Sequence, residues 1–517
     1  MARRLKHWGW GYEDEQPSQA ELRAVAAGIT PMLGFEAAEP EAPVPLDAVA
    51  LPPPRLTPPA HLAAICSTAR YDRVTHAYGK AYRDVVRALR GQVDHPPDVV
   101  AHPRDERAVE AVLAWCEQAK AAVIPYGGGT SVVGGVEPRV DRRYEGTVSL
   151  DLRHLDRVLD VDATSRAALI QAGATGPALE DQLAAHGLTL RHYPQSFEFS
   201  TLGGWVATRA SGHFATGATH IDDLVESVRA VMPRGLWESR RLPGSGAGVS
   251  PDRMLLGSEG TLGVITQAWV RVRERPAHRR GASVHFASFE AGTAAVRAIV
   301  QADLHPANCR LVDAREAALT AGGDGAHALL LLGFESADRP VDARMDRALA
   351  LCAEHGGRAG AQQSSGAWRE AFLRAPYLRD SLICLGVLVE TFETAVTWDR
   401  LADLRVSVSE AVREELAGAG TVTCRFTHAY PDGVAPYFTV LAPARRGDEV
   451  AQWDAVKRVA SDAVLAAGGT ITHHHAVGRD HRPWYDRQRP EPFAAALRGA
   501  KDAVDPCGIL NPGVLVG

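Results

Sequence analysis

The stretch PYGGGTSVVGG occupies residues 125–135 and follows the short apolar run Ala122–Ile124. Consecutive glycines let backbone N–H groups turn inward and approach an anion closely, and Thr130 and Ser131 add hydroxyl donors. The stretch lacks the lysine of a P-loop and the spacing of the G-x-G-x-x-G dinucleotide motif. A strand ending in this turn is therefore typical of an anion-binding loop or of a purely structural turn.

Two further glycine-containing stretches lie downstream. The sequence PQSFEFSTLGGWVATRASG at 194–212 is rich in small residues in its second half. A helix starting near Thr201 can lie against a flat ring or a pyrophosphate and offer its N-terminal amides to negative charge. Tight helix packing also uses small residues, so both interpretations stay open. The stretch LGSEGTLGVIT at 256–266 indicates, on its own, a turn that feeds a strand at Val264–Thr266.

The composition is that of a folded protein with several structural units. Its 517 residues are 46% hydrophobic and 23% charged, and the net charge of −6 gives no basic field for nucleic acid. Apolar runs such as Leu382–Val389 fall far short of the roughly 18 residues that a membrane span needs. Seven scattered cysteines without CxxC spacing, and a start without an apolar signal segment, favour a cytoplasmic location.

Changes in composition and in the pattern of strand-like and helix-like segments predict four zones along the chain. Residues 1–93 form an N-terminal extension with a proline-rich linker and a helical segment, and 94–276 alternate short strands with helices in an α+β pattern. Residues 277–470 repeat strand–helix units, which predicts an antiparallel sheet backed by helices. We expect strands there that include Leu382–Glu390 and Tyr437–Leu441. Residues 471–517 form a C-terminal segment.

Three consecutive histidines, His473, His474 and His475, follow the β-like run Thr470–Thr472. Adjacent strand residues point to opposite faces, so three such imidazoles do not suit one metal ion, and no carboxylate or cysteine lies nearby at metal-ligand spacing. We therefore predict no metal site. Imidazoles can handle protons or orient an anion near neutral pH, and a structural role is the open alternative.

Two single residues have ordinary interpretations when taken alone. Tyr437 interrupts an apolar strand, where most tyrosines are core residues with a satisfied hydroxyl group. Pro436 directly before it leaves the strand geometry there open. Arg379 precedes Asp380, and such a neighbour is typical of a weak surface ion pair.

The order and spacing of the three glycine-containing stretches resemble the FAD-binding domain of the vanillyl-alcohol-oxidase/p-cresol methylhydroxylase (PCMH) superfamily. There, a PxGGGTS loop, a small-residue segment and an EGTLGVI turn hold FAD. The stretches WGWGY at 8–12, 197–212 and IDDLV at 221–225 are similar to the alkyldihydroxyacetonephosphate synthase family in particular. This resemblance runs from residue 8 to about residue 512.

The resemblance implies a two-lobed α+β fold. A PCMH-type FAD-binding domain would cover 94–276, an α/β cap domain with an antiparallel sheet would cover 277–470, and 471–517 would return to the active site and the FAD domain. We expect non-covalent FAD, because the 125–135 loop contains no histidine for covalent attachment. The implied FAD-binding residues come from all three stretches: Pro125, Tyr126, Gly127, Gly128, Gly129, Thr130, Ser131, Gln195, Ser196, Ser200, Thr201, Gly203, Gly204, Thr208, Arg209, Ala210, Ser211, Glu259, Gly260, Thr261, Leu262, Gly263, Val264 and Ile265.

The family reaction replaces the acyl chain of acyl-dihydroxyacetone phosphate by a fatty alcohol in ether-lipid synthesis. By resemblance, Arg379 binds the substrate phosphate with its guanidinium group. Tyr437 is the implied general acid/base, and the histidines share the handling of the substrate proton. The implied catalytic residues are Tyr437, His473, His474, His475 and Arg310.

Two other functions stay open at this point. The same fold can serve an FAD-dependent oxidase or dehydrogenase of a 2-hydroxy acid or related alcohol, because fold alone does not settle function. A non-catalytic lipid- or flavin-binding protein is the second. We expect a lipid or small-molecule substrate and no nucleic-acid partner. The sequence predicts no transmembrane segment, and it leaves open a homodimer and a peripheral contact with a membrane.

Overall fold

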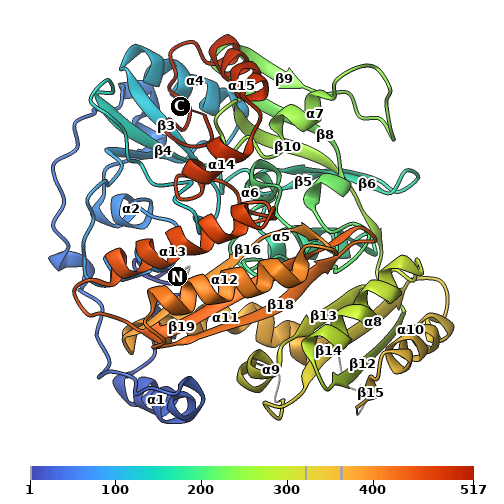
Figure 1. The fold of residues 1–517 in the computed structure, drawn as a ribbon. Coiled ribbons are helices and arrows are strands. Elements are labelled where there is room, and N and C mark those ends of the chain that lie inside the picture. The colour runs from blue at the N-terminus through green and yellow to red at the C-terminus, as the bar shows by residue number, and fades with distance from the viewer. Residues whose placement is uncertain (1–2, 321–322, 361–364, 517) are drawn as a thin grey trace.

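The computed structural model describes residues 3–320, 323–360 and 365–516. The chain forms two lobes, which lie one above the other in Figure 1. The upper lobe contains the strands around the first glycine-rich stretch, and the lower lobe is one large sheet with its helices. The N-terminal helix α1 (Gln19–Leu33) packs beside the lower lobe, against α11 (Ser365–Cys384).

The upper lobe has two main sheets. The first has the order β1-β2-β4-β3, and its last three strands are parallel. The second is antiparallel, with the order β5-β6-β10-β8-β9. The strands are β1 (Cys66–Ser67), β2 (Val99–Ala101), β3 (Ala121–Tyr126), β4 (Gly146–Asp151), β5 (Val158–Asp162), β6 (Ala167–Gln171), β7 (Leu188–Thr189), β8 (Val225–Met232), β9 (Gly235–Glu238), β10 (Val264–Arg271) and β11 (Arg273–Glu274). The helices are α2 (Arg70–Thr75), α4 (Glu106–Gln118), α5 (Gly176–Ala184), α6 (Leu202–Thr208) and α7 (Pro251–Leu255). Helix α3 (Tyr82–Leu89) lies between β1 and β2 in the chain but packs against the lower lobe.

The lower lobe is an eight-stranded antiparallel sheet with the order β15-β12-β14-β13-β18-β19-β16, in which β17 also pairs with β19. Helices α8, α10, α12 and α13 cover one face, and α9 and α11 lie against the other. The strands are β12 (His278–Phe286), β13 (Asn308–Val312), β14 (Ala328–Ser336), β15 (Arg358–Ala359), β16 (Val387–Glu393), β17 (Val396–Thr397), β18 (Thr421–Ala429) and β19 (Gly433–Pro443). The helices are α8 (Phe289–Gln301), α9 (Ala314–Thr320), α10 (Asp342–Glu354), α11 (Ser365–Cys384), α12 (Leu401–Glu415) and α13 (Glu449–Ala466).

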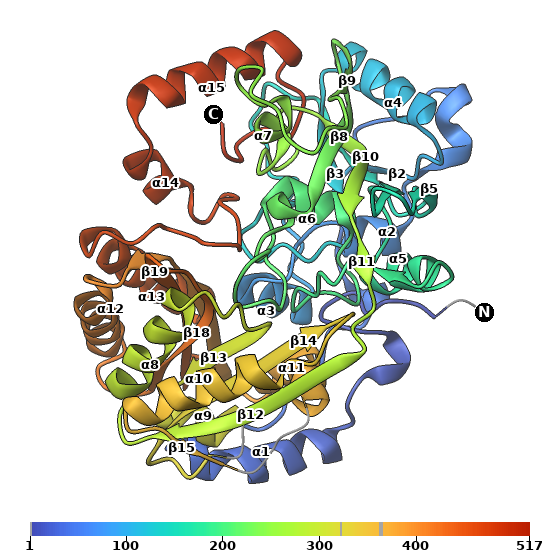
Figure 2. The same ribbon diagram turned by 90° about the vertical axis from the view of Figure 1, so that its right-hand side faces the viewer.

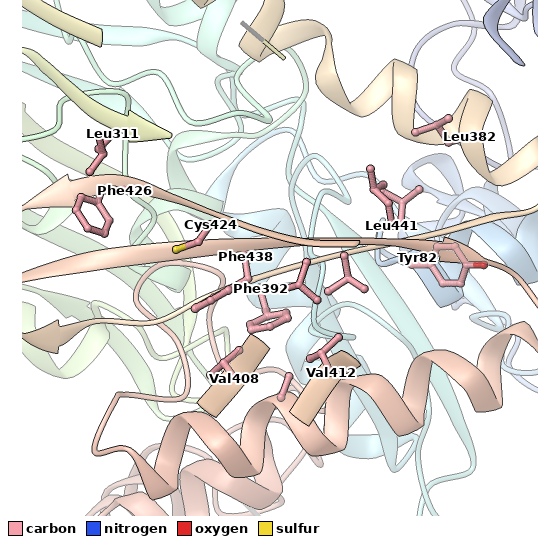
Figure 3. Close-up of a cluster of buried hydrophobic side chains, with 14 of the residues drawn as sticks. Tyr82, Leu311, Leu382, Phe392, Val408, Val412, Cys424, Phe426, Phe438 and Leu441 are labelled. Carbon is pink, nitrogen blue, oxygen red and sulfur yellow. The ribbon is translucent and has the colours of Figure 1, made fainter. Parts of the chain in front are cut away.

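Strand alternation divides this sheet into a core face and a cavity face. Phe392 and Phe438 stack with ring centroids 5.2 Å apart and point toward Val408 and Val412 of α12 (Figure 3). Leu441 lies on the opposite side of the strands, toward α11 (Figure 3). Because neighbouring residues alternate, the residues next to these phenylalanines face away from the α12 core.

After α13 the chain returns to the upper lobe. Figure 2 shows α14 (Arg482–Gln488) and α15 (Glu491–Val504) beside that lobe. The backbone N–H of Asn511 donates to the carbonyl of Val123 in β3, and Leu510 forms a bridge to the same residue. The segment between α13 and α14, with its three histidines, therefore passes from one lobe to the other.

The predicted α+β fold with an antiparallel cap sheet is confirmed, but the predicted strand Leu382–Glu390 is wrong at its start. Helix α11 continues to Cys384, and β16 begins only at Val387. Gly386 adopts a φ of +68°, which ends the helix at a residue without a Cβ. The run is apolar because both elements are buried there, so periodicity could not separate them. Among the described residues, no helix is long and apolar enough to cross a membrane.

Candidate active site

A cavity of about 330 Å³ lies between the two lobes. The first two glycine-containing stretches line one side, and the cavity face of the lower sheet lines the other. Of the FAD-binding residues implied by the sequence, those on the cavity wall are Gly127, Gly128, Gly129, Thr130, Ser131, Gln195, Ser196, Ser200, Thr201, Gly204, Thr208, Ala210 and Ser211.

The first two stretches pack against each other so closely that side chains are excluded. A Cβ atom at Gly128 would lie 1.9 Å from the carbonyl oxygen of Phe199, and one at Gly127 would lie 2.3 Å from Oγ1 of Thr201. Helix α6 begins after Thr201, where the sequence predicted a helix start, and the Thr201 side chain accepts from the N–H of Gly204. The result is a wall made largely of backbone and small residues.

The third stretch supports this wall from behind and does not line the cavity. Gly260 has a φ of +73°, and a Cβ there would lie 2.9 Å from Cγ of Pro125. The Glu259 carboxylate accepts the N–H groups of Val477 and Gly478 at 2.9 and 2.8 Å. The implied FAD-binding residues that do not line this cavity are Pro125, Tyr126, Gly203, Arg209, Glu259, Gly260, Thr261, Leu262, Gly263, Val264 and Ile265.

On the sheet side, Tyr437 lies between two charged residues on neighbouring strands. In register it pairs with Arg425 of β18 and with Glu393 of β16. The Arg425 guanidinium carbon lies 3.9 Å from the centroid of the Tyr437 ring, and Arg425 also forms an ion pair with Glu316. Burial raises the pKa of Tyr437 against the opposing effect of Arg425, so the phenol is a proton donor near neutral pH. Strand β19 runs unbroken through Pro436, opposite a β-bulge between Phe426 and His428.

Two more arginines face the cavity. Arg310 of β13 is buried, and burial, together with nearby Arg425, lowers its pKa to about 9. Arg379 of α11 lies 3.8 Å from Asp380 in an ion pair. Its buried Nε and Nη2 atoms have no hydrogen-bond partner among the described residues. Donors of this kind are costly unless a ligand satisfies them, so Arg379 suits an anionic group.

The three histidines do not follow a strand; this expectation is wrong. Residues 471–475 bend around the Glu393 carboxylate, which accepts the N–H groups of all three histidines. His474 and His475 line the cavity, whereas His473 does not and bonds to the Tyr430 hydroxyl at 2.8 Å. Burial lowers the pKa of His474 to about 3 and that of His475 to about 4. Both imidazoles are therefore neutral near pH 7.

The absence of a nearby carboxylate, assumed from the sequence, is also wrong, because Glu393 lies beside the loop. Ligand atoms of His428, His473 and His474 lie within 4.8 Å of one another, as do those of Glu393, His474 and His475. The Glu393 oxygens already accept four hydrogen bonds from the loop, and His428 Nε2 lies 3.2 Å from the Gly212 carbonyl. These contacts account for the cluster without an ion, and the absence of a metal stays a prediction.

Sequence reasoning assigned no role to Arg425, His428, Glu393 or Glu316. A signal was present in TCRFT at 423–427, where polar Thr423, Arg425 and Thr427 alternate with buried apolar residues. Such alternation marks a polar cavity face on a strand. The partners of Glu393 depend on long-range packing that no local pattern shows.

These residues fit FAD. The backbone wall offers room for a flat ring and N–H donors for a diphosphate, and the buried hydroxyl of Ser211 has no hydrogen-bond partner among the described residues.

Comparison of the chain with known protein families leads to the same cofactor. Residues 97–239 match the family model "FAD binding domain", and residues 275–515 match "FAD linked oxidases, C-terminal domain". The fold and site are therefore those of an FAD-dependent enzyme.

Similarity to individual proteins shows which family of FAD-dependent enzymes this chain belongs to. The chain is 32% identical over 473 residues to an alkyldihydroxyacetonephosphate synthase of Dictyostelium discoideum, covering 86% of this chain and 77% of that one. A solved alkyldihydroxyacetonephosphate synthase superposes with a TM-score of 0.83 at 26% identity, over 98% of this chain and 97% of that one. p-Cresol methylhydroxylase shares the fold, with a TM-score of 0.69 at 16% identity over 96% and 97% of the chains. This chain belongs to the alkyldihydroxyacetonephosphate synthase family, and the resemblance seen in its sequence is confirmed.

Proposed function

We propose that this enzyme exchanges the acyl chain of acyl-dihydroxyacetone phosphate for a fatty alcohol. The observation that carries the proposal is the graded polarity of the cavity. Arg379, Tyr437 and His475 mark a polar region, and Val389 and Leu441, paired across β16 and β19, continue the same sheet face into an apolar one. A substrate with a phosphate head and long hydrocarbon chain matches this gradient.

The apolar region extends away from the sheet. It is lined by Ile29 of α1, Leu319 of α9, and Leu378 and Leu382 of α11. Burying each methylene of a hydrocarbon chain in such surroundings contributes about 0.8 kcal/mol. A small 2-hydroxy acid would leave this region unused, which favours the lipid substrate over the hydroxy-acid alternative.

Each polar side chain has a task in this proposal. Arg379 binds the phosphate through its buried donors. Tyr437, protonated at neutral pH, gives a proton to the leaving carboxylate, while neutral His475 accepts the substrate proton at C1. FAD, bound along the backbone wall, supplies a ring that can accept and return electron density. Buried Arg310 favours the electron-rich form of that ring.

The test is product analysis with purified, FAD-loaded protein. Acyl-dihydroxyacetone phosphate and a labelled fatty alcohol should give labelled alkyl-dihydroxyacetone phosphate and a free fatty acid, with no net oxidation. Bleaching of the flavin by a simple 2-hydroxy acid without oxygen, and no alkyl product, would contradict the proposal and favour the oxidase alternative. Normal FAD loading with neither activity would indicate a binding protein.

We also propose that the enzyme meets these lipids at the cytoplasmic surface of a membrane as a peripheral protein. Leu378, at the apolar end of the cavity, is 44% exposed, and Met32 of the neighbouring helix α1 is 41% exposed. Sedimentation with lipid vesicles should recover the native protein and less of a Met32→Glu/Leu378→Glu variant. Equal recovery of the two proteins would contradict this part.

A further inference from the structure

Glu393 is a fully buried carboxylate that belongs to the cavity side of β16. Its neighbours on the same face, Val389 and Thr391, line the cavity, and its cross-strand partner is Tyr437. The residue is only 1% exposed. Burial of this kind is expensive for a carboxylate unless hydrogen bonds satisfy it, so its partners indicate what it does.

Those partners all come from the loop that carries the histidines. The N–H of His473 donates to one oxygen at 2.5 Å, and those of His474 and His475 donate to the other at 3.0 and 2.8 Å. The Thr472 hydroxyl donates at 2.7 Å to the second oxygen. Burial alone would raise the pKa of Glu393, but the three neighbouring imidazoles and the loop N–H donors hold it well below its usual range. The Glu393 carboxylate is therefore negatively charged near neutral pH.

The far end of the loop is fixed by a second carboxylate, from the other lobe. Glu259 accepts the N–H groups of Val477 and Gly478. Ala476, between the two anchors, has a φ of +73°, a left-handed conformation that is unfavourable for a residue with a Cβ atom. Strain of this kind persists where the surroundings fix the chain on both sides. The loop is therefore held in one shape from both lobes.

We propose that Glu393 is a positioning residue that holds the histidine loop so that His474 and His475 face Tyr437. The ring centroids of His475 and Tyr437 lie 5.7 Å apart, and those of His474 and Tyr437 lie 6.4 Å apart. Glu393 touches neither substrate nor cofactor in this scheme; it acts through the backbone of the loop. The expected effect of Glu393 on catalysis rests on the proposed function, whereas its effect on the shape of the loop does not.

The test compares Glu393→Gln with the matched control Glu390→Gln. Glu390 is a buried carboxylate on the same strand but on the helix face, where it binds Trp453 and Lys457 and not the loop. The isosteric amide at 393 places an N–H₂ group against backbone N–H donors and removes the charge. The first readout is hydrogen–deuterium exchange of the loop amides, which needs no activity. We expect exchange to be at least about tenfold faster in Glu393→Gln and unchanged in Glu390→Gln.

The second readout is steady-state alkyl-product formation. Misplacement of a catalytic group by about 1 Å can cost roughly 100-fold. We expect the kcat of Glu393→Gln to fall about 100-fold, with KM for the acyl substrate within threefold of native and FAD absorbance retained. Native kcat, or native loop exchange, in Glu393→Gln would overturn the proposal. Failure of the native enzyme to form alkyl product would instead refute the proposed function and leave the exchange result to decide on the loop.

A milder variant covers the case in which Glu393→Gln does not fold. Thr472→Val keeps the shape of the side chain but removes the hydroxyl that donates to Glu393 and accepts from the His475 N–H at 3.1 Å. Faster exchange of the His475 amide with a several-fold lower kcat would support the role of the anchored loop. Native exchange and native kcat in this variant would overturn it.

Discussion

Replacing Tyr437 by phenylalanine removes one oxygen atom from the centre of the cavity. The ring itself stays, together with its contact to the Arg425 guanidinium at 3.9 Å. Removing a single buried hydroxyl group in this way costs about 1 kcal/mol of stability. The variant should therefore fold and bind FAD as the native protein does.

The effect on catalysis should be far larger. General acid–base catalysis by a placed side chain contributes roughly 10²- to 10⁴-fold. That range corresponds to about 3–5 kcal/mol of activation free energy at 25 °C. Because phenylalanine has no proton to give, we expect kcat for alkyl-product formation to fall about 1,000-fold.

The control is the next residue along the strand. Phe438 points to the opposite face and packs on α12 (Figure 3), so Phe438→Leu should lower the melting temperature and leave kcat within threefold. The assay is product formation from labelled fatty alcohol at saturating acyl substrate. If Tyr437→Phe keeps more than a tenth of native kcat, the assignment of Tyr437 as the proton donor is refuted.

Three further predictions concern the anion site, a buried carboxylate and the cofactor. Arg379→Gln should raise KM for the acyl substrate at least tenfold in steady-state assays, because in the proposed function its buried donors bind the phosphate; an unchanged KM would refute this role. Burial raises the pKa of Glu259 to about 7, so its contribution to stability is present below pH 4.5 and lost as pH rises through 7. The melting temperature of Glu259→Gln minus that of the native protein should accordingly increase between pH 4.5 and 7. A difference in melting temperature that does not change with pH would contradict this prediction. Acid precipitation should release the yellow colour into the supernatant; colour left in the pellet would show covalent flavin.

Much of the fold could be predicted because its signals are local. The glycine-containing stretches need positive φ angles or close backbone contacts, as at Gly128 and Gly260, and these needs are visible in composition alone. The alternation around Tyr437 and Phe438 follows from strand geometry, since one residue faces the α12 core and the other the cavity. The apolar run from Leu382 gave no such guide, because a buried helix end and a buried strand look alike.

The residues of the site could be predicted only where they belong to a motif that is recognisable in the sequence. Arg379, Tyr437 and two of the three histidines line one cavity, although roughly a hundred residues separate the first from the last. The shape of the histidine loop was not predictable. It depends on Glu393, whose partners lie about 80 residues downstream and meet it only after β16 and the crossing segment are packed. Distant hydrogen bonds of this kind leave no periodic trace in a sequence.

The most direct measurement is a crystal structure of the FAD-loaded protein with a non-reactive analogue of acyl-dihydroxyacetone phosphate. We predict flavin density between the 127–131 wall and the sheet face that bears Tyr437, with the phosphate at Arg379 and the chain along Leu441 toward Ile29. An inter-lobe cavity with no flavin, or a chain bound outside it, would contradict the account.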